Sequence, residues 1–319
     1  MQAHKIIRNF LLTFVSLTFF ACKTEPGFQK TEGVIWNTQY HITYKGSPML
    51  KDSILTVLNE VGSSLSVFDK NSLVSALNNS KQVEADHHLI TVYDASKKLN
   101  EISCGIFDPT VSPLVDAWGF GIGHTPSTDT LAIDSLLNFV GIQKTHRENS
   151  TIFKDDERTR FNFSAIAKGY GCDAIGEMFV RNGVRDYMVE IGGELALKGQ
   201  SPSGDNWRIA IDAPVENSNP GEETVEILEV TDCGIATSGN YRNYREEDGK
   251  KTAHTISPIT GRPVFSELLS VTVIAPTCME ADALATACMA SSLEDAKALL
   301  QAYGAKGYLI TEEGVILSQ

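Results

Sequence analysis

The sequence lacks several features that would place it in a simple functional class. After its first 22 residues it has no second long apolar run, which leaves about 290 residues to build a large core of one or two closely joined domains. Lysine and arginine are scarce, 27 against 40 aspartates and glutamates, which gives a net charge of −13 without a basic patch. We therefore expect no nucleic-acid partner, because such binding needs clustered positive charge. An acidic protein that handles an anionic ligand needs local positive charge or a metal ion.

Cysteine pairs at metal-ligand spacing are also missing. Beyond Cys22 the number of cysteines is odd, which argues against both a disulfide framework and a zinc site. The spacing leaves room for one disulfide in an oxidising compartment, but buried free thiols are the preferred interpretation. These cysteines are Cys104, Cys172, Cys233, Cys278 and Cys288. Internal repeats and low-complexity tracts are absent from the sequence as well.

The first 22 residues predict an export signal that is not part of the fold. A basic start is followed by an apolar stretch, 10–20, which is too short to span a membrane as a permanent helix. Ala21 directly before Cys22 is typical of a bacterial lipoprotein signal, which predicts lipidation of Cys22. Phe19 and Phe20 match that signal loosely, so an ordinary cleaved signal is the alternative.

The lipoprotein interpretation places the mature protein in the bacterial cell envelope, anchored to a membrane by lipid, with the periplasmic face expected. Residues 23–32 are then predicted to form a tether, and residues 33–319 a single domain.

Helical and strand patterns are mixed along that domain. Strands in neighbouring hairpins, interspersed with amphipathic helices, favour an α+β fold of largely antiparallel sheets over a doubly wound parallel sheet. We expect helices at 47–65, 89–103, 165–181, 280–290 and 293–302, and strands at 34–44, 187–191, 194–197, 207–212, 225–230, 269–275, 308–311 and 315–317.

The stretch 161–172, FNFSAIAKGYGC, carries the first chemical signal. Ser164 is available as a helix N-cap, and the helix that follows directs a positive dipole end and unpaired N–H groups at whatever lies ahead, which suits a phosphate. Lys168 opposes that dipole, and Gly169 and Gly171 each cost about 1 kcal/mol relative to alanine. These costs indicate a need for a cation and close backbone approach. The alternative is a helix with a solvated lysine and small residues for tight packing.

Asp282 and Thr286 are four residues apart on the helix predicted at 280–290, so both oxygens face the same way. A carboxylate and a hydroxyl make a hard site that suits Mg²⁺ and leaves room for substrate phosphates and water. The alternative is an aspartate favoured by the helix dipole beside a packed threonine.

Three further features are individually weak. His254 precedes a tight turn, and a lone histidine is more often structural than catalytic. Asp108 precedes a proline and can simply stabilise a turn. Gly192 and Gly193 predict a hairpin turn between two strands.

The order of the motifs is more specific than any one of them. FDPTVSPLVDAWGFG, SAIAKGYGCD, EIGGELALKG, IATSGNYRNY, HTISPITGRPV and SVTVIAPTCMEADALATA follow one another in the sequence. Together they resemble the ApbE family, the FAD:protein FMN transferases, from about Trp36 to the C-terminus. The lipoprotein signal agrees with this resemblance.

The resemblance implies an ApbE-like (T-fold-related) α+β architecture and a Mg²⁺-dependent enzyme that splits FAD. Such an enzyme attaches FMN by a phosphoester bond to a Thr or Ser hydroxyl of a partner protein, and it releases AMP. The family's partners are redox or electron-transfer subunits.

The family's site residues carry over by motif. Its metal ligands, a backbone carbonyl, an aspartate and a threonine, fall on Ala165, Asp282 and Thr286. His254 is expected near the reacting phosphate or the isoalloxazine. Because the attacking hydroxyl needs a proton acceptor, we expect Asp282 or His254 in that role, and the sequence does not choose between them. The implied flavin-nucleotide contacts are Trp36, Phe68, Ile106, Phe107, Asp108, Asn162, Lys168 and Ile256.

This chain departs from the family pattern at three of those contacts. Trp36 stands where a methionine is usual, Asn162 where an aspartate is common, and Phe68 where tyrosine is most frequent. Two other functions remain open at this point: a Mg²⁺-dependent FAD pyrophosphatase that yields FMN and AMP, and a non-catalytic flavin-binding lipoprotein. A purely structural lipoprotein is a third.

Overall fold

An eight-stranded antiparallel sheet forms the centre of the molecule in the computed structural model, which describes residues 27–121, 130–214, 223–239, 244–247, 250–253 and 255–318. Every strand pairs with antiparallel neighbours, in the order β1-β2-β6-β7-β10-β13-β14-β15. The strands are β1 (Phe28–Ile35), β2 (Thr38–Lys45), β6 (Tyr187–Ile191), β7 (Glu194–Lys198), β10 (Cys233–Gly239), β13 (Leu268–Ala275), β14 (Lys306–Thr311) and β15 (Gly314–Ser318).

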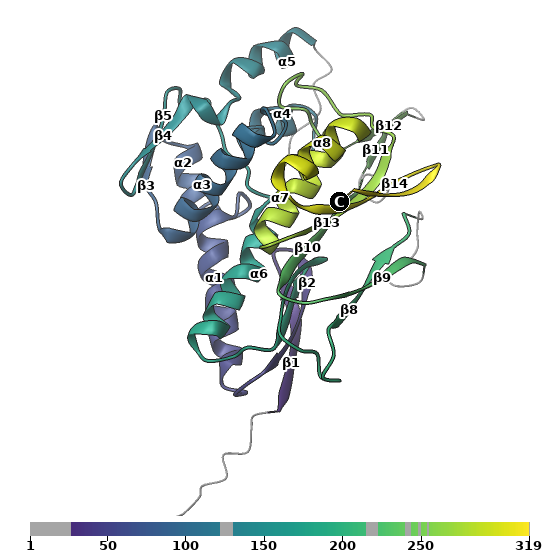
Figure 1. Ribbon diagram of the computed structural model, residues 1–319. Coiled ribbons are helices and arrows are strands. Elements are labelled where there is room, and N and C mark those ends of the chain that lie inside the picture. Colours follow the sequence, from purple (N-terminus) through teal and green to yellow (C-terminus); the bar gives the residue numbers. More distant parts are fainter. Residues whose placement is uncertain are drawn as a thin grey trace, which may run out of the picture.

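Helices cover one face of this sheet (Figure 1). They are α1 (Leu50–Leu65), α3 (His87–Ile102), α6 (Ala167–Arg181), α7 (Cys278–Met289) and α8 (Leu293–Tyr303). The main hydrophobic core lies between these helices and the sheet. Helix α7 is buried on nearly every side and is built of small residues, so β10, β13 and α6 can all pack closely against it.

A two-stranded ribbon, β8 (Trp207–Asp212) and β9 (Thr224–Val230), lies on the other side of the sheet (Figure 1). Alternating side chains explain both layers, because neighbouring residues of a strand face opposite sides. On β7, Ala196 belongs to the helix-side core, whereas Leu197 belongs to a second cluster with Trp207 and Leu228 of the ribbon.

Smaller elements complete the fold. They are α2 (Leu73–Asn78), α4 (Ser112–Ala117), α5 (Thr130–Leu136), two 3₁₀ turns (Leu137–Phe139 and Ile142–Lys144), the sheet β3 (Gln82–Glu84), β5 (Thr151–Lys154) and β4 (Thr145–Glu148), and the hairpin β11 (Tyr244–Glu247) and β12 (Lys250–Ala253). Across the described ranges, no helix has the length and apolar character of a membrane span.

The predicted α+β class is confirmed, but three local predictions were wrong. Residues 34–44 are not one strand: β1 ends at Ile35, and Trp36 and Asn37 form a turn at φ 50° and 62° before β2. No glycine marks this turn in the sequence, although φ is positive at both residues. Strand β1 begins at Phe28, so residues 28–32 belong to the sheet and not to the tether.

The third wrong prediction concerns the start of the central helix. Helix α6 begins at Ala167, its N-cap is Ile166, and no side chain caps it; Ser164 lies in the preceding turn. There the Ser164 N–H donates to Asn162 Oδ1 at 2.9 Å. The five cysteines that the structure describes are all free, as preferred, but only Cys172, Cys278 and Cys288 are buried; Cys104 is exposed and Cys233 is partly exposed.

Candidate active site

Helices α6 and α7 meet at Gly169 and Asp282. The Gly169 N–H donates a 3.0 Å hydrogen bond to Asp282 Oδ2, which joins the first turn of α6 to the side of α7. A Cβ at position 169 would overlap the backbone carbonyl of Cys278 and come within 2.8 Å of Asp282 Cβ. Glycine is therefore needed here for close helix–helix approach, as the sequence suggested.

Asp173, one turn further along α6, holds the start of α7. Its Oδ1 accepts from the N–H of Cys278 at 3.0 Å, and its Oδ2 accepts from the N–H of Met279 at 2.7 Å. This satisfies two of the unpaired donors at the α7 N-terminus. Burial raises the pKa of Asp173 to about 7 against the effect of these bonds, and the charges of Glu280 and Glu177 raise it further.

A cluster of three charged residues lies beside this contact. Lys168 Nζ is 2.7 Å from Glu194 Oε1 and 3.9 Å from Asp282 Oδ1. Asp282 is only 5 % exposed and Glu194 only 4 %, so two buried carboxylates share a single ammonium group. Burial lowers the pKa of Lys168, but the charges of Asp282 and Glu194 outweigh it, and the pKa lies above its ordinary value. Burial raises the pKa of Glu194, and the positive charge of Lys168 opposes this shift.

The cluster suits a cation because two carboxyl groups lie beside a single ammonium group and because Glu194 Oε2 is buried without a hydrogen-bond partner among the described residues. Thr286 follows Asp282 by one turn of α7 and is partly buried. Ala165 lies in the turn immediately before α6 and packs against the main core. Two side-chain oxygens and one carbonyl oxygen are the donor types that Mg²⁺ prefers.

Among the described residues, no group of three or more His, Cys, Asp or Glu side chains is arranged to hold a metal ion. The set predicted from the sequence is of another kind, since only Asp282 belongs to those four residue types.

Asp108 organises a buried loop next to α3. Its Oδ1 accepts from the N–H and hydroxyl of Thr110 at 2.8 and 2.5 Å, and its Oδ2 accepts from the Ile142 N–H at 2.9 Å and Asn100 Nδ2 at 3.1 Å. Burial raises the pKa of Asp108, and these hydrogen bonds oppose the shift. Both oxygens already have protein donors, so the turn-forming alternative describes this side chain well.

The other predicted contacts have different environments. Phe68 is 63 % exposed just after α1, where its ring is accessible to a ligand. Trp36 inserts its indole between two helices: a Cβ at Gly62 of α1 or Gly171 of α6 would collide with its ring. Asn162 connects the Asp108 loop to the turn before α6, because its N–H donates to the Pro109 carbonyl at 2.7 Å.

The side chains of Phe107 and Ile256 are buried in apolar clusters, the main core and a small cluster with Leu114, Ile133 and Val140 respectively. Ile106 is partly buried against the main core. His254 and Cys22 lie outside the described residues.

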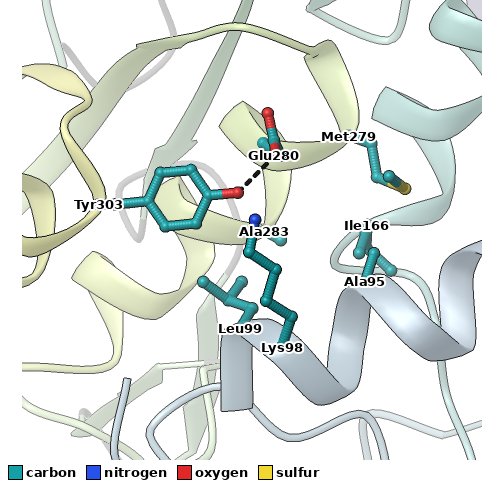
Figure 2. A pocket seen from close by; sticks show the side chains of 8 residues that line it. All are labelled: Ala95, Lys98, Leu99, Ile166, Met279, Glu280, Ala283 and Tyr303. Atoms are coloured by element: carbon teal, nitrogen blue, oxygen red, sulfur yellow. Dashed lines mark hydrogen bonds between the residues drawn. The ribbon is translucent and has the colours of Figure 1, made fainter. Parts of the chain in front are cut away.

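A small pocket lies between α3, α7 and α8, with Ile166, the residue before α6, also in its lining (Figure 2). There the Tyr303 hydroxyl donates to Glu280 Oε1 at 2.5 Å, and Lys98 Nζ lies 5.4 Å from the centre of the Tyr303 ring. Its volume of about 30 Å³ suits a water molecule and not a dinucleotide. Its lining residues are Ala95, Lys98, Leu99, Ile166, Met279, Glu280, Ala283 and Tyr303.

Sequence reasoning missed two residues of this site, Glu194 and Asp173. A signal for Glu194 was present: it is a charged residue at a strand position that alternates with Ala196, on the side that the helices cover. Asp173 lies in the middle of a helical pattern, and no local feature indicates that it caps another helix.

Comparison with known proteins identifies close relatives along most of the chain. The sequence model of the ApbE family matches residues 36–309. The FAD:protein FMN transferase of Vibrio cholerae is 38% identical over 310 residues, which cover 93% of this chain and 91% of the relative. That of Escherichia coli K12 is 35% identical over 295 residues, which cover 89% and 83%.

Solved structures that resemble this chain come from the same family. The flavin transferase ApbE from Vibrio cholerae superposes with a TM-score of 0.80 at 34% identity, covering 91% of this chain and 96% of that one. The apo flavinyl transferase ApbE from Pseudomonas stutzeri has a TM-score of 0.82 at 29% identity, covering 92% and 96%. On the match to the family model and on relatives more than 30% identical over most of its length, this chain belongs to the ApbE family.

Proposed function

We propose that this protein is a Mg²⁺-dependent FAD:protein FMN transferase. It transfers FMN from FAD to a Thr or Ser hydroxyl of a partner redox protein, forms a phosphoester bond and releases AMP. Family membership supports flavin transfer to a protein, because the relatives are named for this activity. The contact of Gly169 with Asp282 is the main structural support for the metal site in this proposal. It joins the start of α6 to a carboxylate of α7.

The metal ligands in this proposal are the Ala165 carbonyl, the Asp282 carboxylate and the Thr286 hydroxyl. A bound Mg²⁺ supplies charge neutralisation on the FAD diphosphate and orients it for in-line attack. The oxygen-rich composition of the buried cluster supports a cation here, since two carboxyl groups face only one ammonium group.

Lys168 and the N-terminus of α6 add positive potential where negative charge builds on the phosphates. Phe68, with its exposed ring, is available to stack on the flavin. The attacking hydroxyl needs a proton acceptor, and we propose Asp282 or His254 for this role.

One experiment separates this function from its competitors. The purified soluble domain is incubated with FAD and Mg²⁺, with and without a candidate acceptor protein. Covalent flavin is read by fluorescence on a denaturing gel, and AMP and FMN by chromatography. A transferase labels the acceptor, a pyrophosphatase releases free FMN even without an acceptor, and a flavin-binding protein releases no AMP.

Two variants make the assignment of Asp282 specific. Asp282→Ala should lose nearly all acceptor labelling, because it removes a proposed metal ligand. The matched control is Asp94→Ala, which removes a half-exposed carboxylate that pairs with Arg147 at 2.7 Å, and this variant should label normally. Normal labelling by Asp282→Ala would refute the metal assignment.

For its location, we propose that the protein is lipid-anchored through Cys22 at the periplasmic face of the cell envelope. The N-terminal sequence supports this proposal, although the segment lies outside the described residues. Incorporation of labelled fatty acid into the wild type and not into Cys22→Ala would support the anchor, and equal labelling of both would exclude it.

A further inference from the structure

Glu194 is a buried carboxylate at a position where the strand pattern calls for an apolar side chain. It is the first residue of β7, and it shares the helix-facing side of the sheet with Ala196. A buried charge costs several kcal/mol unless it is paired. Its retention on this face calls for a specific role.

Its surroundings fix the position of its carboxylate. The Gly192–Gly193 turn directly precedes it, with φ of 66° and 103°, and the Cys172 thiol donates to its backbone carbonyl at 3.2 Å. One carboxylate oxygen contacts Lys168 Nζ at 2.7 Å. The other oxygen is buried and has no hydrogen-bond partner in the described part of the chain.

Lys168 thus has two carboxylates within reach but contacts only one of them closely. Asp282 Oδ1 is 3.9 Å away, and Asp282 Oδ2 is occupied by the Gly169 N–H. If Glu194 carried no charge, Asp282 would be the only anion left for the ammonium group in this cluster. A direct ion pair between Lys168 and Asp282 would then compete with a metal ion for the same oxygen.

We propose that Glu194 is a positioning residue that binds the Lys168 ammonium group and thereby keeps the Asp282 carboxylate available to a divalent cation. This inference rests on the proposed function, because it takes Asp282 as a metal ligand. It assigns to Glu194 an effect on cation affinity that passes through Lys168, and not a contact with the reacting phosphate.

Direct binding of Mn²⁺ provides the first test, because this ion shares the oxygen preference of Mg²⁺ and its free form has a measurable EPR signal. The four proteins are the wild type, Glu194→Gln, Lys168→Ala and the double variant. Glu194→Gln keeps the size of the side chain and should weaken Mn²⁺ binding at least about tenfold. Lys168→Ala removes the competitor and should bind Mn²⁺ at least as tightly as the wild type.

The double variant decides the mechanism. In the Lys168→Ala background, adding Glu194→Gln should weaken Mn²⁺ binding by less than about threefold, since no ammonium group remains to be displaced. An equal loss in both backgrounds would mean that Glu194 acts by its charge alone and would overturn the proposal. So would an unchanged affinity in Glu194→Gln.

Two control variants separate a specific effect of Glu194 from a general loss of negative charge or of folded structure. Glu229→Gln removes an exposed carboxylate from β9, which pairs with Arg208 at 3.8 Å, and should leave Mn²⁺ affinity unchanged. Glu194→Asp keeps the charge and should retain most of the affinity; if it loses as much as Glu194→Gln, the proposal fails. Circular dichroism checks that each variant is folded.

Kinetics give an independent readout. In Glu194→Gln the Mg²⁺ concentration for half-maximal FMN transfer should rise about tenfold, while the rate at saturating Mg²⁺ returns close to that of the wild type. A purely structural role would lower that rate at every Mg²⁺ concentration. A wild type that neither binds Mn²⁺ nor labels an acceptor would instead refute the proposed function, so the two failures are distinguishable.

Discussion

Gly169 and Asp282, 113 positions apart in the sequence, are joined by a hydrogen bond from the backbone N–H of the first to the carboxylate of the second. The bond forms where α6 and α7 are too close for any side chain at position 169. Two features that the sequence presents separately, a glycine in a lysine-bearing helix and an aspartate on a later helix, are therefore in direct contact.

Gly169→Ala should disturb this site more than an ordinary helical substitution does. Alanine has the better helix propensity, but its Cβ would overlap the Cys278 carbonyl, which is backbone and cannot rotate away. We expect a loss of about 1–3 kcal/mol in the free energy of unfolding, measured in urea, together with reduced FMN transfer.

Gly176→Ala on the same helix is the matched control. There the new Cβ would meet the hydroxyl end of the Tyr187 side chain and no backbone atom of a neighbouring element. Its stability should stay within about 1 kcal/mol of the wild type. If both variants lose the same stability, close approach of α6 and α7 is not the reason for glycine at position 169.

Thr286 offers a test of the hydroxyl as a metal ligand. Thr286→Val keeps the shape of the side chain and removes the oxygen, so Mn²⁺ binding should weaken about tenfold or more. Thr286→Ser keeps the oxygen and should bind within about threefold of the wild type. Equal affinities of the valine and serine variants would show that Thr286 is only packed, the alternative that the sequence left open.

Lys168→Met should weaken FAD binding by about tenfold, because it removes the positive charge proposed to face the diphosphate. The measurement is a fluorescence titration with FAD in the presence of Mg²⁺. Lys297→Met is the control, since this lysine lies on α8 in an exposed pair with Glu294 at 2.8 Å. An unchanged affinity in Lys168→Met would remove Lys168 from the nucleotide site.

The buried carboxyl group of Asp173 should make the free energy of unfolding depend on pH. Burial raises its pKa in the folded protein to about 7 from an ordinary value of 3.8, so the folded state binds the proton more tightly than the unfolded state does. The resulting stabilisation is complete below pH about 4 and is lost as the pH rises through about 7. As the pH rises from 5 to 8, the free energy of unfolding of the wild type should therefore fall by on the order of 2 kcal/mol relative to that of Asp173→Asn.

Urea unfolding of both proteins at several pH values measures this difference. Asp173→Asn carries no titrating group at that position, so the contribution of the other carboxylates cancels in the comparison. Curves that run parallel from pH 5 to 8 would mean that Asp173 stays ionised throughout, held by its two backbone donors on α7.

Motif order and local periodicity were sufficient for the α+β class and the family. The periodicity at 280–290 placed Asp282 and Thr286 on one helix, and the Gly192–Gly193 pair placed a hairpin between β6 and β7. These features depend on residues close together in the chain, whose spacing follows from the geometry of a helix or a strand.

Only the tertiary structure decided how Glu194, Lys168 and Asp282 share their charges. The alternation of β7 places Glu194 on one side of the sheet, but the helices that cover this side come from distant parts of the chain. In the same way, Asp173 caps a helix that begins 105 positions later. Such contacts depend on how complete elements pack, and local patterns hold no information about the partner that will face a side chain across the core.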